Sequence, residues 1–148
     1  VFGDAAIEED YVAPALGWAV TQNLPIVFIC EDNDLSVLTK TEDRRSWKAV
    51  DLANSLNMYA VDITDDPWLI AYHVKKIRES GEPGFINIRT VRGIWHAGTG
   101  VDDDLEWNRY ELVEKELSVM GLSKEMTEIN INNKKRVDLI WQKLQQKL

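Results

Sequence analysis

The sequence predicts an α/β fold with a mainly parallel sheet. Short apolar runs alternate along the chain with longer segments in which apolar residues recur at helical spacing. Residues 26–30 are apolar throughout and rich in β-branched side chains, as expected for a strand that is buried on both faces. The chain has 148 residues, a length that suits one hydrophobic core. We therefore expect a single domain over residues 1–148, with a helical carboxy-terminal part at 105–148.

The first third of the chain predicts two strands joined by a helix. Pro14 lies inside the helical pattern, so the regular helix either begins near this residue or kinks there. Residues 34–47 are polar and rich in turn formers, which predicts a loop. The elements expected here are the end of a strand at 1–2, a helix over about 8–22 and a strand at 26–30.

The rest of the chain continues the alternation. Asp65-Asp66-Pro67 is a typical helix start, and Ser80-Gly81 a typical helix end. Residues 93–104 hold three glycines and three consecutive aspartates and predict a loop, and a polar connection with Asn130, Asn132 and Asn133 separates two final helices. The expected elements are helices at 49–56, 67–80, 106–120 and 134–147, a strand at 59–63, and an alternating strand at 85–90.

Composition excludes several classes of function. The net charge is −8, and the few clustered bases argue against binding to nucleic acid. No apolar run approaches the length of a membrane helix, about 18 residues. Cys30 is the only cysteine, which rules out an internal disulfide and suggests a reducing, cytoplasmic location. Because the chain begins inside an apolar strand without Met, we expect a fragment or a clipped product.

Polar side chains follow the first two predicted strands, at the point where each strand ends. Asp4 comes just after the apolar pair at 1–2, and Asn33 just after the strand at 26–30, with room for one helix between them. Ligands of open α/β sheets bind beyond the carboxyl ends of the strands. The start of a helix at that edge favours a phosphate group. Carboxylate and amide oxygens are suitable ligands for Mg²⁺. We expect Asp4 to lie outside the core. Alone, Asp4 is better explained as a helix cap and Asn33 as a turn residue, but together, at two strand ends one helix apart, they favour the metal site.

Two further basic positions invite a functional interpretation. His96 lies in a glycine-rich stretch after the strand at 85–90, where its imidazole could present a donor to a phosphate; the alternative is a surface histidine in a loop. Arg44-Arg45 is either a phosphate clamp or a solvated loop pair, and we favour the solvated pair. His73 lies at apolar spacing within a helix, so we interpret it as structural.

These residues carry a resemblance to thiamine-diphosphate-dependent enzymes. Gly3-Asp4-Ala5 followed by Asn33 resembles the Gly-Asp-Gly motif that these enzymes close with Asn-Asn or Asp-Asn. The stretch 23–33 is similar to the alpha subunit of the 2-oxo-acid dehydrogenase component, and the stretch 92–99 resembles it again. Transketolases share the Asp-Asn form, and the chain resembles them as well. The resemblance implies a three-layer, thiamine-diphosphate-binding fold that is incomplete at the amino terminus.

The resemblance also implies roles for individual residues. Asp4 and Asn33 would ligate Mg²⁺ through side-chain oxygens, and Leu35 through its backbone carbonyl. Backbone groups of Gly3, Ala5 and Ala6 would meet the diphosphate of the cofactor, and His96 would contact the same diphosphate. The family has glycine at the position of Ala5, and a serine at the position of Ala97. No residue of this chain is assigned a catalytic role.

The implied activity is that of an oxidoreductase subunit. The chain would be the diphosphate-binding part of an alpha-type subunit that decarboxylates a 2-oxo acid and passes the acyl group to lipoamide. It would act with a beta-type subunit that supplies the pyrimidine-binding domain, in a homo- or hetero-oligomer. Two alternatives stay open: a transketolase-like transferase or decarboxylase subunit with the same cofactor, and a non-catalytic remnant of the fold.

Overall fold

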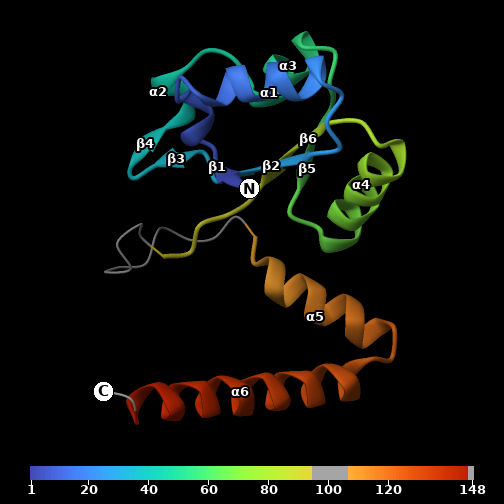
Figure 1. Ribbon diagram of the computed structural model, residues 1–148. Helices are drawn as coiled ribbons and strands as arrows, with labels where there is room; N and C mark the ends of the chain where they lie inside the picture. The colour runs from blue at the N-terminus through green and yellow to red at the C-terminus, as the bar shows by residue number, and fades with distance from the viewer. Residues whose placement is uncertain (95–106, 147–148) are drawn as a thin grey trace. The chain divides into compact units, whose positions relative to one another are not determined.

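The computed structural model describes residues 1–94 and 107–146 (Figure 1). The chain divides into two compact units, Val1–Trp107 and Asn108–Leu148. His96 and most of the predicted glycine-rich loop lie outside the described residues. Among the described residues, no helix is both long enough and apolar enough to cross a membrane.

The first unit is built on a four-stranded parallel sheet, which confirms the predicted α/β class. Its strands, in spatial order, are β1 (Phe2–Gly3), β2 (Val27–Asp32), β6 (Gly84–Arg89) and β5 (Tyr59–Thr64). In β6 only Arg89 is exposed, so the alternation expected for this strand is wrong. The strand lies between two neighbours in the sheet and under helices on both faces, and therefore needs apolar side chains on both sides.

Helices cover both faces of the sheet, giving three layers (Figure 1). On one face, α1 (Val12–Thr21) and α3 (Ala49–Ser55) pack on the sheet through Leu16 and Ala53, both fully buried. On the other face, α4 (Pro67–Ser80) contributes Ile77 to a cluster of buried isoleucines.

The helix ends follow the local signals in the sequence. The Asp66 carboxylate accepts hydrogen bonds from the backbone N–H groups of Trp68 and Leu69, and Gly81 ends α4 in the left-handed conformation at φ 70°. A short 3₁₀ helix, η1 (Ala6–Glu8), precedes α1. Pro14 is the third residue of α1, where its missing N–H removes no intrahelical bond, so the helix begins near it.

The segment between β2 and α3 is not the plain loop that its composition predicts. It contains an antiparallel pair, β3 (Leu35–Ser36) and β4 (Thr39–Lys40), followed by the four-residue helix α2 (Thr41–Arg44). The backbone N–H of Thr41 donates to the carbonyl of Asp34 at 3.1 Å and closes this excursion. Elements of two to four residues are too short to leave a periodic apolar pattern, which is why the sequence does not reveal them.

The second unit is a pair of helices, α5 (Arg109–Val119) and α6 (Ser123–Gln145). The polar connection expected around Asn130, Asn132 and Asn133 is wrong, because all three residues lie inside α6. Each asparagine costs a helix only a few tenths of a kcal/mol, ~0.7 kcal/mol at most. The segment also has no Gly or Pro that would end the helix. The side-chain amide of Asn130 donates to the Tyr110 hydroxyl at 3.1 Å and ties α6 to α5.

Candidate cofactor site

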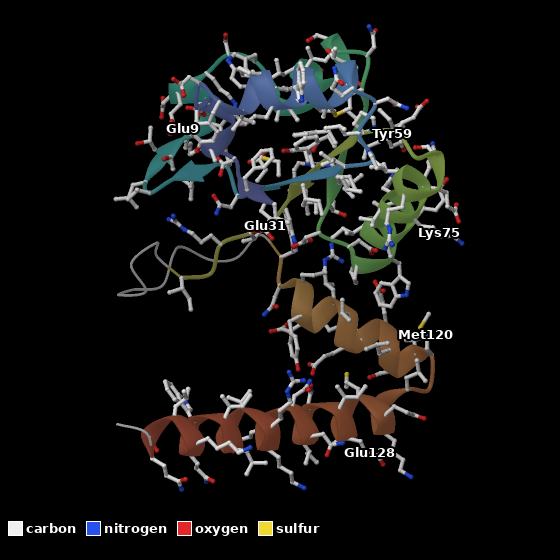
Figure 2. All side chains as sticks on the ribbon, viewed as in Figure 1. Glu9, Glu31, Tyr59, Lys75, Met120 and Glu128 are labelled. Atoms are coloured by element: carbon white, nitrogen blue, oxygen red, sulfur yellow. The ribbon has the colours of Figure 1, made fainter. Side chains whose placement is uncertain are left out.

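Asp4 and Asn33 follow two strands that are neighbours in the sheet. β1 and β2 pair in parallel, with Phe2 opposite Cys30 and Gly3 opposite Glu31. Glu31, labelled in Figure 2, therefore marks the carboxyl end of the sheet, where the chain leaves both β1 and β2. The predicted adjacency of the two strand ends is confirmed.

Asp4 is buried, which contradicts the expectation that it lies outside the core. It is 3% exposed, and its Oδ2 accepts from Nη2 of Arg44 at 2.5 Å and from the Thr41 hydroxyl at 3.4 Å. It is not a helix cap either, since the residue that precedes η1 is Ala5 and makes no side-chain capping bond. The carboxylate is instead one partner of a buried ion pair that joins two segments distant in the sequence.

Arg44 and Arg45 are not the solvated pair that the sequence favours. Their side chains are 12% and 3% exposed, and both donate to Oε1 of Glu8, at 2.6 and 2.7 Å. Arg45 also donates to the backbone carbonyl of Asp4 at 2.7 Å and lies over the ring of Trp47, 4.9 Å from its centroid. Two cations and two anions therefore form a balanced cluster, which lowers the cost of burying each charge.

Asn33 adopts the local turn that its residue type allows. Its Oδ1 accepts from the backbone N–H of Leu35 at 3.0 Å, the arrangement of an Asx turn. Ala5 has ordinary right-handed dihedral angles, φ −73° and ψ −29°, so its backbone does not require glycine. A Cβ placed on Gly3 would meet only the carbonyl oxygen of Glu31, at 4.0 Å.

A second polar group, which sequence reasoning missed, lies on the same sheet. The side-chain amide of Asn87, in the middle of β6, donates to Asp32 at 3.0 Å and to Asp62 at 3.1 Å. Asn87 is 5% exposed, and among the described residues its Oδ1 has no hydrogen-bond partner. The available signal was an asparagine inside an apolar strand, because a buried amide needs partners. Arg89 balances part of this charge through Asp62, at 3.3 Å.

The donor chemistry of Asp4 and Asn33 fits Mg²⁺, which takes carboxylate and amide oxygens. Among the described residues, no group of three or more His, Cys, Asp or Glu side chains could hold a metal ion. Such a site would thus depend on these two side chains together with backbone and cofactor oxygens. The Arg44 guanidinium is bound to Oδ2 of Asp4, so that contact must be exchanged for a metal ion to bind this oxygen.

No family model matches the sequence, but comparison with known proteins finds a similar curated sequence and similar solved structures. The chain is 27% identical over 127 residues to the alpha subunit of acetoin:2,6-dichlorophenolindophenol oxidoreductase from Bacillus subtilis (strain 168). The match covers 81% of this chain and 38% of that relative, so the chain spans well under half of its length.

The solved structure of transketolase from Campylobacter jejuni subsp. jejuni NCTC 11168 superposes with a TM-score of 0.52 and 19% sequence identity. It covers 60% of this chain and 14% of the transketolase chain. With a four-stranded parallel sheet between helices, this chain has a fold like that of part of transketolase, and it resembles an oxidoreductase alpha subunit in sequence.

Proposed function

We propose that the chain is the diphosphate-binding part of an alpha-type subunit of a thiamine-diphosphate-dependent oxidoreductase that acts on 2-oxo acids. The observation that supports this most directly is the position of Asp4 and Asn33 after the adjacent parallel strands β1 and β2. The similarity to an oxidoreductase alpha subunit over 127 residues supports the same assignment.

Each residue near the strand ends has a role in this proposal. Asp4 and Asn33 hold Mg²⁺ through their side-chain oxygens, and Leu35 contributes its backbone carbonyl. The backbone of Gly3, Ala5 and Ala6 would contact the diphosphate. His96, which lies outside the described residues, would contact the diphosphate as well.

The residues of this chain bind and orient the cofactor, which when bound supplies the chemistry for cleaving a bond next to a carbonyl group. With the cofactor bound, the complete enzyme would decarboxylate the substrate and pass the acyl group to lipoamide. A beta-type subunit with the pyrimidine-binding domain completes the enzyme. The relative's name, which designates an alpha subunit, supports a partner of this kind.

A non-catalytic remnant of the fold is the second candidate. Two observations favour it: the Asp4 carboxylate is already paired with Arg44, and Ala5 stands where the resembled motif has glycine. A remnant would keep the sheet and the ion cluster but would bind no thiamine diphosphate.

Calorimetric titration with thiamine diphosphate, with and without Mg²⁺, separates the two candidates. We expect binding that requires the metal and that Asp4→Asn weakens by at least about tenfold, because the neutral amide loses a charged ligand, a change of about 1.4 kcal/mol. Asp43→Asn, an exposed change nearby in α2, is the matched control and should bind as the unaltered chain does.

Because Asp4 is buried, circular dichroism must first show that Asp4→Asn is folded. Metal-dependent binding that survives Asp4→Asn would refute the assignment of Asp4. No binding by the folded, unaltered chain would favour the remnant.

A further inference from the structure

The Asp4 carboxylate has a built-in competitor for any metal ion. Nη2 of Arg44 reaches Oδ2 of Asp4 at 2.5 Å, and the same nitrogen donates to the Thr41 hydroxyl at 3.0 Å. Asp4 and Arg44 are both largely buried, at 4% and 12% side-chain exposure. A charge-assisted contact of this kind is strong, and a cation that takes Oδ2 of Asp4 as its ligand must displace it.

The cluster also contains a place for the displaced guanidinium. Nη1 of Arg44 is already bound to Glu8 at 2.6 Å, and the Glu8 side chain is 27% exposed. Arg44 can therefore leave the Asp4 carboxylate and stay paired with an anion. When Arg44 releases Asp4, no buried charge is left without a partner. Leaving a buried charge unpaired would cost about 3–5 kcal/mol.

Arg45 plays a different part from its neighbour. It donates to the backbone carbonyl of Asp4 and to Glu8, and in the described part of the chain it makes no hydrogen bond or ion pair with the Asp4 carboxylate. It therefore holds the main chain at Asp4 in place. The carboxylate oxygens of Asp4 remain available to Arg44 or to another cation. Arg44 itself sits at the end of the four-residue helix α2, whose short length makes a local change inexpensive.

We propose that Arg44 is an autoinhibitory residue that competes with the divalent cation for Asp4, so that the metal site forms only when Arg44 releases Asp4 and keeps its contact with Glu8. This inference rests on the proposed function, since it concerns the same site. It predicts that the concentration of Mg²⁺ needed for cofactor binding is set by the strength of the Asp4–Arg44 contact.

The test is the Mg²⁺ concentration that gives half-maximal binding of thiamine diphosphate to the full 148-residue chain, followed by calorimetry. We expect Arg44→Gln to lower this concentration by about tenfold, the equivalent of about 1.4 kcal/mol. Arg45→Gln removes the same charge from the cluster without touching the carboxylate and should have a smaller effect. Arg78→Gln, exposed on α4, controls for net charge and should have no effect.

Glu8→Gln is a second variant, and it should change the Mg²⁺ requirement in the opposite direction. Without Glu8 the displaced guanidinium has lost its alternative partner, so the Mg²⁺ requirement should rise. An unchanged or raised requirement in folded Arg44→Gln would overturn the proposal, as would a lowered requirement in Glu8→Gln. Loss of binding in Arg44→Gln alone would overturn it too, by making Arg44 a cofactor contact.

The two proposals fail in different ways. Metal-dependent binding with equal Mg²⁺ requirements in all variants would refute the competition and leave the proposed function standing. Absence of binding in the unaltered chain and in Arg44→Gln alike would refute the proposed function and the competition with it.

Discussion

A buried carboxylate such as Asp4 is stable only with a partner of opposite charge. In the fold described here that partner is Arg44, and the cluster with Glu8 and Arg45 leaves no net charge to be desolvated. This makes alanine a poor probe of Asp4, because it removes a structural ion partner along with a ligand. Asparagine keeps the shape of the side chain and is the better substitution.

His73 shows a residue whose role is structural, as its position in α4 predicts. Its Nδ1 lies 2.9 Å from the Tyr59 hydroxyl, and the Lys76 ammonium lies over the Tyr59 ring at 4.4 Å from its centroid (Figure 2 labels Tyr59). Desolvation first, and the charge of Lys76 second, lower the pKa of His73 below its ordinary value of 6.5. The folded chain therefore favours the neutral imidazole.

The lowered pKa predicts a pH dependence of stability. As the pH falls through 6.5, the unfolded chain takes up a proton that the folded chain accepts only at lower pH, so the free energy of unfolding should decrease. Urea unfolding between about pH 7.5 and 5 should show a steeper loss for the unaltered chain than for His73→Gln. The effect is small because the ring is only half-buried. Identical slopes for the two proteins would contradict this origin.

At the scale of elements, the packing of α4 on β6 depends on a residue without a side chain, Gly84. A Cβ placed on Gly84 would come within 2.6 Å of the Ile77 side chain, which is 3% exposed and cannot move into solvent. Gly84 also starts β6, where it pairs with Val27 on one side and Tyr59 on the other. The close approach of helix and sheet therefore requires glycine at this position.

Gly84→Ala should destabilise the chain by about 1–3 kcal/mol, the usual cost of overpacking a core. Gly17→Ala is the matched control, because Gly17 lies inside α1 and its added Cβ would meet only Leu56, at 4.0 Å. Alanine is the better helix former, so the control should gain up to about 1 kcal/mol. Chemical denaturation measures both changes. A neutral Gly84→Ala would show that α4 can shift away from the sheet.

At the scale of the whole molecule, Cys30 reports on the integrity of the first unit. It is fully buried at the centre of the sheet, next to Asn87 in register. Burial first, and then the nearby carboxylates of Asp32 and Asp4, raise the pKa of its thiol to about 12. Both exposure and thiolate formation therefore require unfolding.

We expect a thiol reagent at about pH 8 to label Cys30 only through unfolding. An exposed thiol in the unfolded chain has a pKa near 8.5 and is partly ionised at this pH, so it reacts, whereas the buried thiol does not. The labelling rate should follow the fraction unfolded as urea is added, measured beside circular dichroism. Cys30→Ala, which should take up no label, checks the assignment of the signal. Rapid labelling without denaturant would mean that the sheet opens locally around β2.

The sequence alone determined the class of the fold and the neighbourhood of the candidate site. Alternating apolar runs and helical patterns predicted the parallel sheet, and Asp66 and Gly81 marked the ends of α4, because these signals act over a few neighbouring residues. Asp4 and Asn33 were placed together by the spacing of one strand, one helix and the next strand. Their roles as ligands stay predictions.

Only the tertiary structure decided what surrounds Asp4. Arg44 reaches it from 40 positions away in the sequence, and the amide of Asn87 joins Asp32 from 55 positions away. A pair of arginines in a polar segment has the same local pattern whether solvated or buried. The difference arises from charge compensation, which depends on which distant carboxylates the folded chain brings within hydrogen-bond distance.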